Sequence, residues 1–117
     1  MSAHTGARRV ILELGHGNDL HGGDYTKAAI RAVQDAIHHS SLTLIRTLGV
    51  KPEGMQVDVT IGVQQPEAVD RDAVKAALPH GTVTVSVVKG GLDVPDEALG
   101  DVAVIASAAI AVSIARD

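Results

Sequence analysis

Alternation of apolar and polar residues along the chain predicts four β-strands. In each of them, branched or small apolar side chains recur at every second position, the period that gathers side chains on one face of a strand. The strands are expected at residues 9–14, 56–63, 82–88 and 102–115. In the first strand, Val10, Leu12 and Leu14 are expected to face the core. The last segment is apolar enough for a buried helix, but its two distinct alternating faces favour a strand.

Apolar residues at three- and four-residue steps predict two helices. The longer helix is expected at 24–48 and the shorter one at 71–78. Asp24 and Asp70 stand at the two starts, where a carboxylate accepts the free backbone N–H groups of a first turn. Both segments carry an apolar stripe on one side and charged residues on the other.

These elements predict a single domain, 1–117, in the order β-α-β-α-β-β. The expected fold class is an α/β (α+β) two-layer sandwich, in which a mixed four-stranded sheet carries one long and one short helix on one face. The second face of the sheet would be small or polar, and it would meet another subunit or line a cleft. That face would carry Asp58, Thr60, Thr82, Thr84, Ser107 and Ser113.

Composition points to self-association. Apolar residues make up 45% of the chain of 117 residues, but aromatic residues only 1%, with one Tyr and no Phe or Trp. The core must therefore be built from aliphatic side chains, which bury less area than rings do. We expect a homo-oligomer in which association buries part of the apolar surface.

Charge and cysteine content exclude several functions. The formal net charge is −4 and the Lys and Arg residues are scattered, so the basic stripe typical of nucleic-acid binding is missing. The chain has no Cys, which excludes disulfides, a thiolate nucleophile and a cysteine zinc site. No apolar run reaches the roughly 20 residues of a membrane helix, and residues 1–8 lack a signal-peptide core. We expect a soluble cytoplasmic protein.

A glycine-rich polar stretch, GHGNDLHGG at 15–23, separates the first strand from the long helix. Gly15, Gly17, Gly22 and Gly23 are candidate ligand-binding residues because glycine lets backbone N–H groups approach a ligand closely. The free N–H groups of the following helix would favour an anion. The stretch is neither a dinucleotide-binding nor a P-loop signature, and no Lys follows it.

Asp19 and His21 in this stretch are the candidate catalytic pair. A carboxylate that binds one imidazole nitrogen fixes the tautomer and leaves the other nitrogen available as a base. Alternatively, His16, Asp19 and His21 are candidate metal ligands, since two imidazoles and a carboxylate suit zinc or iron. Their H-x-x-D-x-H spacing matches no strong metal signature. A third interpretation is that the polar groups only close the loop.

The same stretch resembles the signature of a small conserved-hypothetical family found in bacteria and, with a long N-terminal extension, in plants. That signature, Gly-x-Gly-x-Asp-x-His-Gly, corresponds to Gly15, Gly17, Asp19, His21 and Gly22. The similarity extends to the D-Y-T-K-A-A and H-S-S-L-T-L segments of the expected helix. The resemblance implies no particular reaction or cofactor. It places Asp19 and His21 at fixed positions, which favours the pair over a three-ligand metal site.

The sequence therefore supports two hypotheses of different kinds. The first is an oligomeric enzyme that acts on a small polar or anionic metabolite, with His21 as the acid–base group and Asp19 as its orienting partner. The alternative is a non-catalytic metal- or ligand-binding oligomer. No cofactor follows from the sequence, and hydrolysis, isomerisation and lyase chemistry are not separated.

Overall fold

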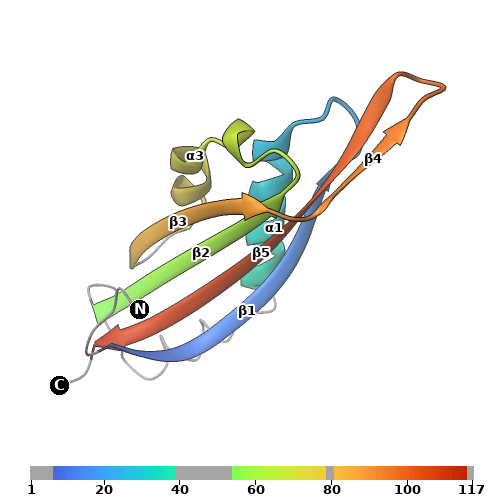
Figure 1. Ribbon diagram of the computed structural model, residues 1–117. Helices are drawn as coiled ribbons and strands as arrows, with labels where there is room; N and C mark the ends of the chain where they lie inside the picture. Colours follow the sequence, from blue (N-terminus) through green and yellow to red (C-terminus); the bar gives the residue numbers. More distant parts are fainter. Residues whose placement is uncertain (1–6, 39–53, 79–80, 116–117) are drawn as a thin grey trace.

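A computed structural model describes residues 7–38, 54–78 and 81–115, which form a five-stranded mixed sheet with two helices on one face (Figure 1). Its elements are β1 (Ala7–Asp19), α1 (Tyr25–His38), β2 (Met55–Val63), the 3-10 turn η2 (Pro66–Ala68), α3 (Arg71–Ala76), β3 (Thr82–Lys89), β4 (Leu92–Asp96) and β5 (Asp101–Ala115). The α+β class and the long final strand are confirmed.

The sheet is organised around β5, which pairs with three other strands. The strand order is β1-β5-β2-β3, and β4 pairs with the first residues of β5. Among hydrogen-bonded neighbours in the described sheet, only β2 and β3 are parallel, whereas β5 is antiparallel to β1, β2 and β4. The hairpin of β4 and β5 projects beyond the body of the sheet (Figure 1).

The prediction of four strands is wrong by one, because it left residues 89–101 without a strand. The structure places β4 in this segment, with Pro95 opposite Val102. A proline has no N–H to donate and is therefore confined to strands with an open edge. Since β4 pairs only with β5, it has such an edge, and the proline does not prevent a short strand there.

Helix α1 covers β1 and β5 with a face of mostly small side chains. Its buried residues are Tyr25, Ala28, Ala29, Ala32, Val33 and Ala36. The predicted long helix is confirmed over 25–38, and its expected remainder, 39–48, lies outside the described residues. β2 and β5 supply valine, isoleucine and alanine side chains to a core in which Tyr25 is the only aromatic residue.

Helix α3 begins as predicted, because the Asp70 carboxylate accepts the N–H groups of Asp72 and Ala73. It lies in the same layer as α1 and packs beside β3. Among the described residues, neither helix has the length and apolar character needed to cross a lipid bilayer.

β1 extends further than predicted and has the opposite side facing the helices. The strand was expected to end at residue 14, but it continues to Asp19. Ile11 is buried, whereas Leu12 and Leu14 are 51% and 62% exposed. The expectation that the leucines face the core is therefore wrong. The physical reason lies in the glycines that follow them on the other face.

Gly15 and Gly17 lie directly beneath α1. A Cβ atom built on Gly15 would be 2.4 Å from the Ala32 carbonyl oxygen, and one on Gly17 would be 2.2 Å from the Ala32 nitrogen. Real Cβ atoms do not approach backbone so closely, so only glycine fits at either position. The backbone of α1 thus rests on the backbone of β1, and this contact decides which face of β1 is covered.

Replacing Gly17 by alanine is expected to lower the free energy of unfolding by at least about 2 kcal/mol, because overpacking against rigid backbone costs about 1–3 kcal/mol or more. Gly54→Ala is the matched control, since no atom lies within 4 Å of a Cβ at that position. Urea denaturation of both variants provides the measurement. Equal midpoints would contradict the close α1–β1 contact.

Candidate functional site

The candidate site begins where β1 ends, in a short loop that leads to α1. Gly22 and Gly23 have positive φ angles of 93° and 64°, a conformation that side chains disfavour. The predicted loop 15–23 is therefore partly wrong, because Gly15 and Gly17 belong to β1 and contact the helix. Only the second half of the stretch forms a glycine-dependent turn.

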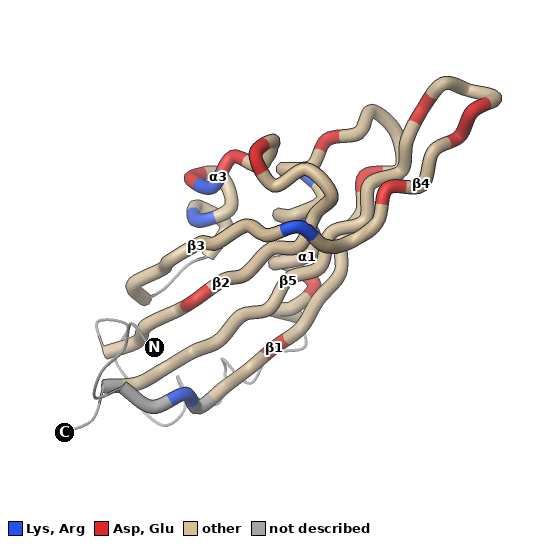
Figure 2. Tube along the Cα trace, viewed as in Figure 1, with Lys and Arg blue, Asp and Glu red and all other residues tan. Residues whose placement is uncertain are grey.

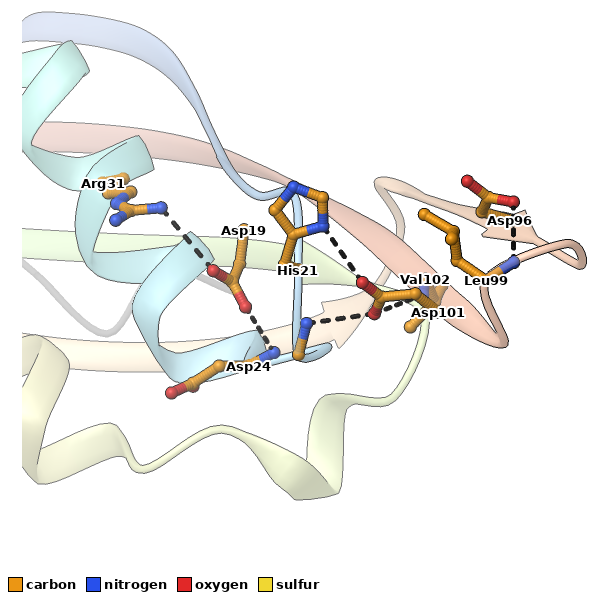
Figure 3. A network of polar contacts seen from close by, with 9 residues as sticks. Asp19, His21, Asp24, Arg31, Asp96, Leu99, Asp101 and Val102 are labelled. Carbon is orange, nitrogen blue, oxygen red and sulfur yellow. Dashed lines mark hydrogen bonds and ion pairs between the residues drawn. The ribbon is translucent and has the colours of Figure 1, made fainter.

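Asp19 is directed at the helix rather than at His21 (Figure 3). Its side chain is buried, and its Oδ2 accepts the Asp24 backbone N–H at 2.9 Å. Its Oδ1 lies 3.7 Å from a guanidinium nitrogen of Arg31. Asp19 therefore fastens the start of α1 to the end of β1.

The first turn of α1 is capped by carboxylates of this chain. Besides the bond from Asp24 to Asp19, the Asp24 side chain accepts the Lys27 N–H at 3.0 Å. A helix N-terminus attracts anions through these donors. Because the two carboxylates already accept the N–H groups of Asp24 and Lys27, the arrangement gives less support to the anion site expected here.

His21 pairs with Asp101, at the start of β5. Its Nδ1 lies 3.0 Å from Oδ2 of that carboxylate. The Asp101 Oδ1 accepts the N–H groups of Gly22 at 3.1 Å and Val102 at 2.8 Å (Figure 3). These bonds, that from Gly22 first, hold the pKa of Asp101 below its ordinary value.

The pair has the geometry of an oriented imidazole. An ionised carboxylate at Nδ1 favours the tautomer with the proton on Nδ1, which leaves the Nε2 lone pair free. The His21 side chain is 80% exposed, so this ring is accessible to solvent. Sequence reasoning found His21 but not Asp101, which lies 80 residues away and has no local signal.

His16 does not join the pair. Its backbone N–H donates to Asp35 at 2.9 Å, and its side chain lies on the face of β1 opposite to Asp19. Within the described ranges, no group of three or more His, Cys, Asp or Glu side chains is arranged to hold a metal ion. The three candidate ligands His16, Asp19 and His21 are therefore not brought together.

Side chains of α1 also bind the outer edge of β1. Arg31 donates to the Asn18 carbonyl at 2.7 Å, and Asp35 accepts the His16 N–H. β1 ends the sheet on this side, so these backbone groups have no neighbouring strand. Helix side chains thus cover an edge that would otherwise be open to another strand.

A second polar contact, missed by sequence reasoning, joins α1 to β4. The Tyr25 hydroxyl donates to Oδ2 of Asp93 at 2.5 Å. This hydrogen bond, together with burial, raises the pKa of Tyr25 to about 12. The other oxygen of Asp93 is buried and has no hydrogen-bond partner among the described residues.

The hairpin beside His21 is acidic. Asp93, Asp96, Glu97 and Asp101 lie along it, and residues 92–101 contain no Lys or Arg (Figure 2). A field of one sign around an exposed imidazole repels anions and attracts neutral polar or cationic groups.

Comparison with known proteins identifies relatives over nearly the whole chain. A family model described as "Conserved hypothetical protein (Lin0512_fam)" matches residues 9–112. A crystal structure of an FtsZ-like protein of unknown function from Nostoc punctiforme matches with a TM-score of 0.81 and 37% identity. The match covers 94% of this chain and 98% of that one. Among curated proteins no match is found.

Tyr25 is the only aromatic residue of the chain, so tyrosinate absorbance reports on it alone. We expect a midpoint near pH 12 in the folded protein, against about 10 in the unfolded chain. Because folding raises the pKa of Tyr25, its contact with Asp93 stabilises the protein fully below about pH 10. This stabilisation is lost as the pH rises towards 12.

The variant Asp93→Asn should lower that midpoint towards 10, since it removes the charge that opposes ionisation of the phenol. Asp72→Asn, on the exposed side of α3, should leave it unchanged. A wild-type midpoint near 10 would contradict the Tyr25–Asp93 contact.

Proposed function

We propose, for a chain that belongs to the Lin0512 family of conserved hypothetical proteins, that His21 is the acid–base group of a site for a small polar metabolite. The observation that carries the proposal is the bond from Nδ1 of His21 to Asp101, which leaves Nε2 facing solvent. An imidazole oriented in this way transfers protons near neutral pH.

The pair is built from the turn itself. Asp101 is held by the N–H groups of Gly22 and Val102, so its carboxylate is fixed before any ligand arrives. Preorganisation of this kind is what makes a dyad useful, because the base needs no rearrangement during proton transfer. Gly22 is thus assigned to positioning the dyad, and Asp19 to holding the loop against α1.

The surroundings favour a neutral polar or cationic ligand over an anionic one. Asp19 and Asp24 already accept two backbone N–H groups at the start of α1, those of Asp24 and Lys27. The neighbouring hairpin carries four carboxylates and no Lys or Arg. We therefore propose a ligand with hydroxyl or amino groups, which can donate to Nε2 of His21.

The high exposure of His21 favours a second candidate function, ligand binding without turnover. A general base is most effective where water is excluded, whereas an imidazole that only accepts a hydrogen bond needs no such enclosure. In this candidate the same Asp101–His21 pair recognises the ligand, and no proton is transferred in a reaction.

The orientation of the imidazole is testable without a ligand. Long-range proton–nitrogen NMR spectra, recorded where the ring is neutral, should show the His21 proton on Nδ1. In Asp101→Ala this preference should be lost. Asp96→Ala is the control, because Asp96 accepts the Leu99 N–H and does not contact His21. A wild-type ring protonated on Nε2 would refute the dyad.

A ligand panel tests the function itself. Sugars, polyols and amino alcohols are compared with carboxylates and phosphates by amide shifts of isotope-labelled protein. The neutral and cationic members of the panel should shift the amide signals of His21 and Gly22. His21→Ala should weaken their binding about tenfold, the worth of one lost hydrogen bond. His38→Ala, an exposed histidine at the end of α1, serves as the control.

The outcome also separates the two candidates. A bound compound that the wild type converts and His21→Ala does not convert supports the enzyme. Binding that depends on His21 without conversion supports the second candidate. Binding that maps to other residues, or that survives in His21→Ala, would overturn both.

A further inference from the structure

The sheet face opposite α1 and α3, here called the open face, is not covered by any other element in the part of the chain that the structure describes. On the helix side, the sheet residues are buried in the core. On the open face, five large apolar side chains are half-exposed or more. They are Leu12, Leu14, Val88, Leu92 and Val94. These make up five of the seven exposed large apolar residues of the described structure.

The pairing of the strands places these five residues on one surface, with the leucines at 12 and 14 on β1, Val88 on β3, and Leu92 and Val94 on β4. Leu12 and Leu14 lie opposite Ala111 and Ala109 of β5, and Leu92 lies opposite Ile105. Residues paired across a sheet point to the same side. The leucines of β1 therefore form a ridge along one border of β5.

The β5 strand beside this ridge presents small side chains. Ser107, Ala109 and Ala111 follow one another on the open face, and Gly62 and Thr60 of β2 lie opposite Ser107 and Ala109. These three β5 residues are here called the small-residue row. A ridge of leucines beside a row of small side chains makes this face complementary to a copy of itself, as a two-fold interface requires.

We infer that the open face is the contact between copies of this chain, with the leucine ridge of each copy lying along the small-residue row of the other. This inference does not depend on the proposed function, because it uses side chains other than His21 and Asp101. The charge and the area of the open face both favour a second copy of the chain over another partner.

Charge on the open face favours self-association. The whole chain has a net charge of −4, which opposes the approach of two copies. Between the pairs Arg9–Ser113 and His16–Ser107, the described open face carries one arginine, one aspartate (Asp58) and one histidine. Copies that meet over this part of the face, away from the acidic β4 hairpin, avoid most of the repulsion. A membrane surface, by contrast, selects faces rimmed by several Lys and Arg residues.

The area is sufficient for a specific contact. Four strands about 4.8 Å apart and eight residues long, at about 3.3 Å per residue, span roughly 500 Å² of flat sheet. The accessible surface of the side chains on this part of the sheet is larger than its flat area. Specific interfaces bury about 600–1,000 Å² on each partner. Two open faces therefore provide an interface of ordinary size.

Sedimentation and light scattering of the full chain give the first test. The wild type should have at least twice the chain mass of 12.0 kDa. Leu14→Glu, which puts a carboxylate on the ridge, should sediment at 12.0 kDa with its helical circular dichroism retained. Leu99→Glu is the matched control: Leu99 is 72% exposed, but it lies in the β4–β5 turn and should leave the assembly intact.

A second measurement covers the case in which Leu14→Glu does not fold. The chain has no Cys, so Thr60→Cys places a single spin label in the middle of the open face. This label should show spin–spin broadening between copies, whereas one at Asp72→Cys on α3 should not. A wild type of 12.0 kDa at high concentration, including one that binds lipid vesicles, would overturn the inference. An assembly that survives in Leu14→Glu, or lacks broadening at position 60, would also overturn it.

Discussion

The structure depends on one close approach, that of the α1 backbone to the backbone of β1. Gly15 and Gly17 leave no room for a Cβ atom, and Ala32 and Ala36 face them from the helix. The chain has no Phe or Trp, so its core lacks large aromatic rings. The close backbone contact supplies van der Waals attraction in their place. It also brings Arg31 and Asp35 within reach of the outer edge of β1, where they satisfy backbone groups that have no neighbouring strand.

This approach divides the glycine-rich stretch into two parts with different roles. The first part, with its two glycines and Asp19, packs and fastens the helix. The second part turns the chain at Gly22 and presents an imidazole to solvent, paired with Asp101. Packing explains the two glycines and the buried Asp19 of the first part. The exposed side chain of His21 is held by Asp101, and for that reason the proposed function is centred on it.

Much of the fold was predictable because it rests on local patterns. The alternation in β2, β3 and β5 and the Asp70 cap of α3 correctly gave those elements. The orientation of β1 was not predictable in the same way: its leucines look like core residues, and only the helix packing on Gly15 and Gly17 shows otherwise. Asp101 was missed for a related reason, since it meets His21 only when β5 lies beside β1.

The central claim, that α1 and β1 form one tightly joined unit, is tested most directly by native-state hydrogen exchange of the His16 amide. This N–H lies at the outer edge of β1 and points away from β5, and its acceptor is the side chain of Asp35 on α1. If the claim holds, it exchanges only through global unfolding, at the same rate as the amides in the middle of α1. Fast exchange at His16, while the amides of β5 stay protected, would contradict it.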